Sequence, residues 1–136
     1  MGSAVIPEGF GDLLSEPLIV HMATVRPDGQ LQNNPMLFEW DGERFKMSLT
    51  KSRQKYRNLL ADPRIAISVT DAANPYRYLE LRGTIDKIED DANNDFLNSC
   101  AKRYMGLDEY PYHPPGAERI IVSFVPQSTS HQGDPN

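Results

Sequence analysis

Residues 30–49 read QLQNNPMLFEWDGERFKMSL, and this stretch decides the fold class of the chain. Asp41-Gly42 stands between two runs of strand-like residues, which is the pattern of a tight antiparallel hairpin, because the central residues of such a turn need positive φ. We therefore expect a strand over residues 30–40, bent near Asn34-Pro35, that pairs with a strand over residues 44–49.

The segments on either side of this hairpin add strands and a few helices. Apolar and alternating runs predict further strands over residues 18–25, 64–70, 78–88 and 119–125. Helical spacing of apolar residues predicts helices over residues 7–16, over 52–61, and from Asp90 or Asp91 to Gly106. The expected fold is mainly β with α insertions. Hairpin-length links favour a six-stranded antiparallel barrel with helices at its ends.

Length and composition restrict the class of protein. The 136 residues fit a single domain over 1–136 with flexible tails at about 1–5 and 127–136, and a core of this size would gain from packing against a second copy. The 14 basic and 19 acidic residues give a net charge of −5, which argues against a general nucleic-acid or anionic-membrane binder. The single cysteine, Cys100, leaves no disulfide or zinc pattern, so we expect a reducing cytoplasm, and no apolar run is long enough for a membrane span.

Residues 50–58, TKSRQKYRN, form the one stretch with clear chemical content. They hold four cations and no anion in an acidic chain, and they fall where a helix is expected to begin. Cations there oppose the helix dipole, whereas a bound anion would be held by the free N–H groups and the basic side chains together. The stretch therefore indicates a phosphate site, with a solvated basic face as the alternative.

From Gly29 to Gly83 the chain resembles the pyridoxamine 5′-phosphate oxidase-like family, which has a split β-barrel flavin-binding fold. Within that family it most resembles the deazaflavin-dependent reductases of actinobacteria, which use coenzyme F420. The resemblance is carried by the order and spacing of five blocks, Lys51–Lys55, Arg57–Leu59, Asp62–Arg64, Asn74–Tyr76 and Glu80–Gly83.

The resemblance implies three groups of cofactor contacts. The phosphate and, in a deazaflavin, the acidic tail would be held by Lys51, Ser52, Arg53 and Lys55, with Asn58 on the same side of the helix. The ring would be bordered by Asn33, Asn34, Pro35 and Met36, with Met47, Ser48 and Thr50 beneath it. Tyr76 and Tyr78 would reach in from a second subunit, because members of the family bind their cofactor at a homodimer interface.

The implied activity is hydride transfer from reduced F420 to an electron-poor conjugated small molecule. An FMN-binding oxidoreductase of the same fold and a non-catalytic flavin or deazaflavin binder are alternatives, since each places a phosphate at the same helix end. A small barrel that binds single-stranded nucleic acid through its basic helix and tyrosines is a further alternative, against which the acidic total weighs.

Several candidate residues also have purely structural interpretations. Asn34-Pro35 is also consistent with a simple strand bend, and Tyr76 and Tyr78 with a dimer core, since they point to one face of a strand. His113, in a Tyr- and Pro-rich loop with Tyr110 and Tyr112, either lines a pocket mouth or faces solvent.

Overall fold

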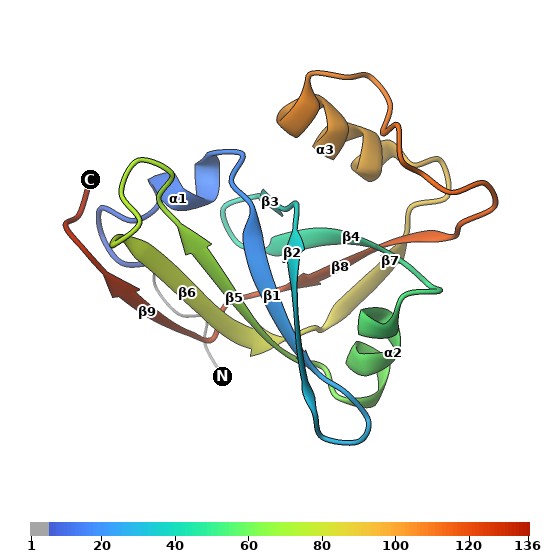
Figure 1. The fold of residues 1–136 in the computed structure, drawn as a ribbon, viewed down its shortest axis with the longest axis horizontal. Helices are drawn as coiled ribbons and strands as arrows, with labels where there is room; N and C mark the ends of the chain where they lie inside the picture. Colours follow the sequence, from blue (N-terminus) through green and yellow to red (C-terminus); the bar gives the residue numbers. More distant parts are fainter. Residues whose placement is uncertain (1–5) are drawn as a thin grey trace.

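The computed structural model describes residues 6–136, so the expected tail at 1–5 lies outside the described residues. These residues form nine strands and three helices (Figure 1). The strands are β1 (Val20–Val25), β2 (Leu31–Met36), β3 (Glu39–Trp40), β4 (Phe45–Thr50), β5 (Arg64–Thr70), β6 (Tyr78–Thr84), β7 (Lys87–Asp90), β8 (Arg119–Phe124) and β9 (Ser128–Gln132). The helices are α1 (Asp12–Ser15), α2 (Gln54–Ala61) and α3 (Asp95–Met105).

The strands form two antiparallel sheets, in the orders β2-β1-β5-β6-β9 and β3-β4-β8-β7. The mainly β class with α insertions is thus confirmed, while the expected six-stranded barrel is replaced by nine strands in two sheets. The hairpin at Asp41-Gly42 is confirmed, because β3 pairs with β4 and Gly42 has φ +97°.

Two of the expected strands each divide between the two sheets. The 30–40 run breaks after Met36 rather than at Asn34-Pro35, because β2 is an edge strand, where a proline removes no needed donor. The 78–88 run breaks after Thr84, close to Gly83, whose Cα lies so near the next sheet that a Cβ there would come within 2.6 Å of the Phe124 ring. Only glycine allows that approach.

The chain after β8 also differs from expectation. The segment from Gln127 was expected to be a flexible tail, but β9 pairs along β6 from Tyr78↔Gln132 to Arg82↔Ser128. The polar, serine-rich sequence of β9 does not predict a strand. An edge strand with an exposed face needs few apolar residues, so its composition resembles that of a tail.

The core lies between the sheets, where alternate residues of both point inward. It contains Val20, Met22, Phe45, Met47, Leu49, Ile67, Val69, Leu79, Leu81, Ile120, Val122 and Phe124, all buried. The Phe38 and Phe45 rings stack at 4.7 Å, and this contact joins the segment after β2 to the second sheet.

All three helices are shorter than expected. The 7–16 helix contracts to α1, with Leu13 and Leu14 buried, and the 52–61 helix begins at Gln54. Within α2, Asn58 and Leu59 are buried, whereas Leu60 is 59% exposed. The buried Asn58 amide donates hydrogen bonds to Thr24 of β1 and Gln32 of β2, which ties α2 to these two strands.

The helix expected from Asp90 or Asp91 begins at Asp95 instead. The Asp91 carboxylate accepts hydrogen bonds from the backbone N–H groups of Phe96 and Leu97, so it holds the start of α3 from outside the helix. At the other end Gly106 adopts the left-handed conformation, as expected. None of the helices among residues 6–136 has the length and apolar character needed to cross a membrane.

Candidate functional site

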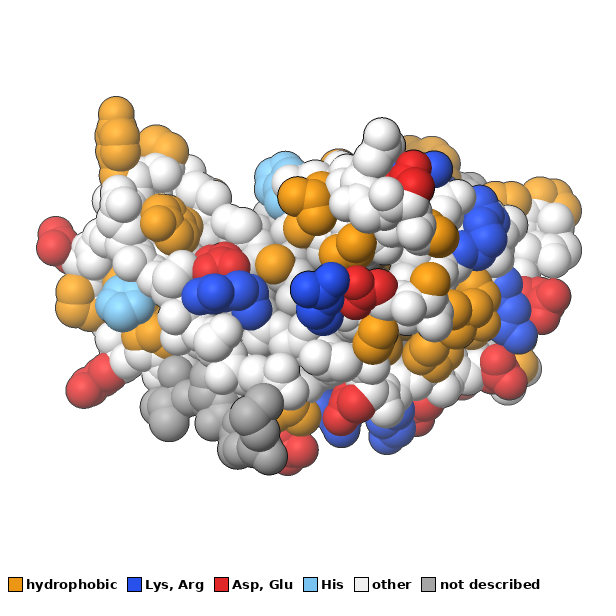
Figure 2. Space-filling model, turned by 90° about the horizontal axis from the view of Figure 1, so that it is seen from below, with side chains coloured by type: hydrophobic (Ala, Val, Ile, Leu, Met, Phe, Trp, Pro, Cys, Tyr) orange, Lys and Arg blue, Asp and Glu red, His pale blue; other side chains and the backbone are white. Residues whose placement is uncertain are grey.

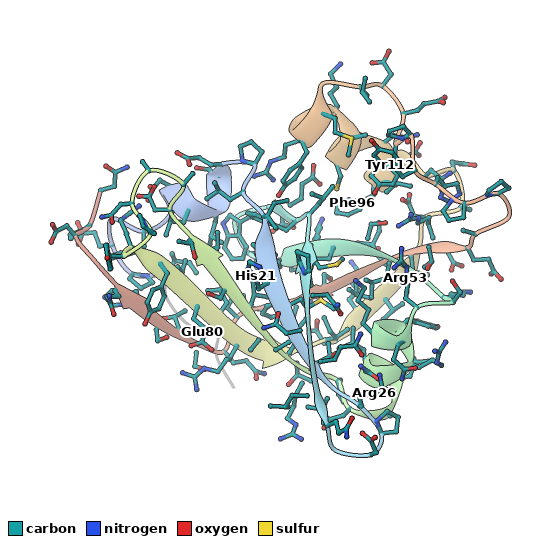
Figure 3. The ribbon with its side chains drawn as sticks, in the orientation of Figure 1. His21, Arg26, Arg53, Glu80, Phe96 and Tyr112 are labelled. Carbon is teal, nitrogen blue, oxygen red and sulfur yellow. The ribbon has the colours of Figure 1, made fainter. Side chains whose placement is uncertain are left out.

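A cavity of about 410 Å³ opens where β2, β4, α3 and the loop before β8 meet. It is lined by Ile19, Pro35, Met36, Leu37, Ser48, Leu49, Thr50, Arg53, Lys55, Leu97, Cys100, Met105, Tyr110, Tyr112 and Arg119. Figure 3 shows Arg53 and Tyr112 at the same end of the molecule, Arg53 from the segment after β4 and Tyr112 from the loop after α3. The volume is within the usual range for small-molecule and cofactor sites.

Three cations line this cavity without a carboxylate partner. Within residues 6–136, Arg53, Lys55 and Arg119 form no salt bridge, and no Asp or Glu lines the cavity. Within residues 6–136, the Lys55 ammonium donates one side-chain hydrogen bond, to the sulfur of Met36 at 3.0 Å. A thioether sulfur is a weak acceptor. A bound anion would give the Lys55 ammonium a stronger acceptor than this thioether.

The pKa values follow this arrangement. Burial lowers the pKa of Lys55, and the neighbouring charges of Arg53 and Arg119 lower it further. Burial likewise lowers the pKa of Arg119, with Arg53 contributing in the same direction. By contrast, a hydrogen bond to Glu118 raises the pKa of Lys51, only four residues from Lys55. The protein therefore pays a charge-repulsion penalty at the cavity that an anionic ligand would relieve.

Cations elsewhere are commonly paired, which sets the cavity apart. Arg44 binds Asp86 at 2.7 Å, Arg64 binds Asp62 at 2.6 Å, and Arg82 binds Glu80 at 3.2 Å. On the face shown in Figure 2, basic side chains lie beside acidic ones. Arg53, Lys55 and Arg119 thus form a local positive cluster in an acidic chain.

The start of α2 places two of these cations. A turn after β4, in which the Arg53 N–H donates to the Thr50 carbonyl at 3.1 Å, brings Arg53 to the position just before the helix. Lys55 then lies in the first turn of α2, which contains no acidic residue. The partial positive charge of a helix N-terminus adds to the two side chains, so the whole corner favours an anion.

The opposite wall is apolar and aromatic. Helix α3 contributes Leu97, Cys100 and Met105, and the loop that follows contributes Tyr110 and Tyr112, whose rings meet edge to face at 5.7 Å. Burial raises the pKa of the Cys100 thiol to about 12, so this side chain acts as a small apolar group. A planar apolar body fits this wall.

Packing of α3 fixes that wall against the rest of the protein. The Tyr104 hydroxyl donates to the Leu18 carbonyl at 2.6 Å and accepts the Phe38 N–H at 3.2 Å. Arg103 donates to the carbonyls of Phe38 and Glu16 and lies over the Phe38 ring. The buried face of α3 is thereby held over the cavity.

The structure brings six of the expected site residues together. Pro35, Met36, Ser48, Thr50, Arg53 and Lys55 all line the cavity. They come from β2, β4 and the start of α2, as the resemblance implies.

The other expected residues lie outside the cavity. Met47 faces the core, because β4 alternates and its neighbour Ser48 faces the cavity. Lys51 is ion-paired with Glu118 at 3.3 Å, and the Ser52 hydroxyl lies 3.2 Å from that of Thr50. Asn33 is exposed on the edge strand β2, and Asn34 accepts a hydrogen bond from Gln32.

Asn58 does not line the cavity and instead holds α2 against the neighbouring strands. It is fully buried, donates to Thr24 and Gln32 at 3.0 Å each, and accepts from Gln54 at 2.9 Å. Tyr76 lies just before β6, and Tyr78 is the first residue of β6, where it pairs with Gln132. Neither residue lines the cavity of this chain.

Arg119 is the main site residue that sequence reasoning missed. It lies more than 60 residues from the basic stretch, and only the pairing of β4 with β8, which sets Thr50 opposite Arg119, brings it to the cluster. The sequence places Tyr110 and Tyr112 only in the Tyr- and Pro-rich loop around His113, and the structure adds both to the cavity lining. His113 lies at this end of the molecule and contacts Arg119.

The arrangement suits a ligand with an anionic part and a planar apolar part. In residues 6–136 no group of three or more His, Cys, Asp or Glu side chains is placed to hold a metal ion. The unpartnered cations fit the phosphate of a flavin-type cofactor, and the aromatic wall fits its ring or a planar substrate.

Comparison with known proteins agrees with this geometry. The family model for pyridoxamine 5′-phosphate oxidase matches residues 6–132. A solved structure described as an F420 reductase is 46% identical, with a TM-score of 0.84 over 92% of this chain and 98% of the other. No curated protein matched the chain.

More distant structures share the fold alone. General stress protein 26 from Bacillus anthracis is 18% identical, with a TM-score of 0.68 over 94% of this chain and 93% of the other. A conserved hypothetical protein from Mycobacterium tuberculosis is 21% identical, with a TM-score of 0.69 over 97% and 88% of the two chains. Since the family model spans nearly the whole chain, this protein belongs to the pyridoxamine 5′-phosphate oxidase family.

Proposed function

We propose that this protein is an F420-dependent reductase that transfers a hydride from the reduced deazaflavin to an electron-poor conjugated small molecule. The observation that carries the proposal is the cavity, where the unpaired Arg53, Lys55 and Arg119 face an apolar wall. The 46% identity to a protein described as an F420 reductase favours F420 over FMN as the cofactor.

The side chains that line the cavity have distinct tasks in this proposal. Arg53 and Lys55 hold the phosphate and the acidic tail, because they are the cations at the start of α2. Pro35, Met36 and Ser48 border the ring. When bound, the cofactor supplies the hydride, and the protein supplies orientation and a shielded surface.

The chain contributes little acid–base chemistry of its own. In the described residues no carboxylate or imidazole lines the cavity, and Cys100 is held as a neutral thiol. The proton that completes the reduction therefore comes from water or from a tyrosine hydroxyl, with Tyr110 and Tyr112 at the apolar wall.

A second copy of the chain completes the proposed site. Tyr76 is 76% exposed and does not line the cavity of its own chain, so it is free to contact another molecule. We place the cofactor at a homodimer interface with Tyr76 and Tyr78 contributed by the partner. Sedimentation equilibrium of the purified protein should give twice the chain mass of 15.4 kDa.

Two measurements test the function. Titration with F420 and with FMN, followed by absorbance and fluorescence, should give tight binding of F420 and weaker binding of FMN. Addition of an enone or quinone panel to the complex with reduced F420 should restore the absorbance of oxidised F420. Tight binding of FMN alone would contradict the choice of cofactor, and F420 binding without any turnover would indicate a carrier.

A further inference from the structure

His113 is the polar side chain in contact with the cavity cluster that the proposed function leaves without a task. It lies in the loop between α3 and β8, six residues before Arg119, where β8 begins. Its Nδ1 accepts a hydrogen bond from the Arg119 Nε–H at 3.1 Å. In this contact Nδ1 is the hydrogen-bond acceptor.

This contact fixes the direction of the Arg119 guanidinium. With Nε held by His113, Nη1 lies 3.5 Å from the Ser48 hydroxyl on the cavity wall. The guanidinium carbon also lies 5.6 Å from the centre of the Tyr110 ring, within the range of a cation–π contact. Arg119 thus has two partners on the loop, His113 and Tyr110, and within residues 6–136 it forms no salt bridge.

The same contact holds the loop. The Tyr110 N–H donates to the Asn98 side chain at 3.1 Å, which ties the first part of the loop to α3. The His113–Arg119 hydrogen bond ties its second part to β8. The loop carries Tyr110 and Tyr112, so the aromatic wall and the cation cluster share one anchoring side chain.

We propose that His113 is a positioning residue, which aims the Arg119 guanidinium at the anion-binding end of the cavity and holds the tyrosine loop against β8. Arg119 is then a third anion-binding residue, supplied by β8 rather than by the basic stretch before α2. The inference builds on the proposed function, in which the anion is the acidic part of the cofactor, but the contacts that carry it concern this chain alone.

A double-mutant cycle between His113 and Arg119 tests this role. The probe is inorganic pyrophosphate, and its affinity is measured by calorimetry at low salt. Arg119→Gln should weaken binding about tenfold, because a charge-assisted hydrogen bond is lost. His113→Ala should weaken it roughly threefold, because the guanidinium is no longer aimed. In the Arg119→Gln background, His113→Ala should have no further effect, since His113 acts through Arg119.

Conservative and control variants separate positioning from simple folding damage. His113→Asn should restore most of the affinity, because the Asn amide oxygen sits as far along the side chain as Nδ1 does. Lys87→Gln removes one positive charge from the exposed strand β7 and should leave binding unchanged. Melting temperatures of all variants show whether any loss of binding follows from unfolding.

The outcomes also distinguish this inference from the proposed function. If His113→Ala weakens binding equally with and without Arg119, or if Asn fails to restore what Ala removes, the positioning role is wrong. A lack of pyrophosphate binding by the wild type would also overturn it. If F420 does not bind while the cycle behaves as described, the proposed function fails and the positioning role stands.

Discussion

Lys55 shows how a single side chain can favour binding at the cost of stability. Its ammonium is half-buried, it faces Arg53 and Arg119, and its side chain donates to a thioether. A lysine in that position weakens the folded state unless an anion is present.

Replacement of Lys55 by methionine should therefore separate binding from stability. Met has a similar length and no charge, so Lys55→Met should raise the melting temperature of the free protein or leave it unchanged. The same change should weaken F420 binding about tenfold or more, because a charge-assisted hydrogen bond is lost. Calorimetric unfolding and cofactor titration measure the two effects. A variant that binds F420 as the wild type does would remove Lys55 from the site.

Cys100 should be inert in the folded protein. With its pKa raised to about 12 by burial, only about one thiol in ten thousand is ionised at pH 8. Alkylation by iodoacetamide, followed by mass spectrometry, should be very slow in buffer and rapid in 6 M guanidinium. Fast labelling of the native protein would mean that the cavity wall opens readily.

At the scale of elements, Arg77 joins three parts of the chain. It is 4% exposed and donates to Asp12 in α1, Asp71 after β5, and the carbonyls of Gly9 and Asp134. Its guanidinium also lies 4.7 Å from the centre of the Phe10 ring. The N-terminal segment, the β5–β6 turn and the segment after β9 are thus held by one side chain.

Removal of this side chain should destabilise the fold strongly. Arg77→Met leaves two partly buried carboxylates without their partner, so we expect the free energy of unfolding to fall by about 3 kcal/mol. Urea unfolding at pH 7 measures the change. Arg64→Met, which breaks an exposed pair with Asp62, is the matched control and should leave the unfolding midpoint nearly unchanged. Equal effects of the two substitutions would contradict the anchoring role.

The ion pairs of Arg77 with Asp12 and Asp71 predict that the stability of the fold depends on pH. The hydrogen bond from Arg77 lowers the pKa of Asp12, and the Ala73 N–H, followed by Arg77, lowers the pKa of Asp71. A carboxyl with a lowered folded pKa stabilises fully above its unfolded pKa, near 3.8, and loses that contribution as the pH falls through the folded value. The stability difference between wild type and Arg77→Met should therefore shrink between pH 5 and pH 2. A difference that stays constant over this range would contradict it.

Elements were predictable where one signal dominated and not where two competed. The Asp41-Gly42 hairpin and the Gly106 helix end follow directly from turn and cap chemistry. The start of α3 was placed too early, because Asp91 acts on the helix from outside it. β9 was missed, because a polar edge strand has the composition of a tail.

At the scale of the whole molecule, the site depends on pairing between distant segments. The sequence indicated the cations of the basic stretch and residues of β2 and β4 that were expected beside a cofactor ring, and six of these residues line one cavity. The pairing of β4 with β8 adds Arg119, and α3 closes the apolar wall. Neither the pairing of β4 with β8 nor the position of α3 can be predicted from the spacing of residues along the chain.

The charge of the molecule sharpens the test of this site. With a net charge of −5, the protein as a whole repels a polyanion, so any tight binding of F420 must come from the local cluster. Increasing salt should weaken that binding, because exposed ion pairs are screened.

The most direct test is therefore a side-by-side titration of wild type and the Arg53→Gln/Lys55→Met double variant with F420, at low and at high salt. We expect tight, salt-sensitive binding by the wild type and a loss of at least a hundredfold in the variant, about tenfold for each cation. Equal affinity of the two proteins, or no binding by the wild type, would contradict the assignment of this cavity as the cofactor site.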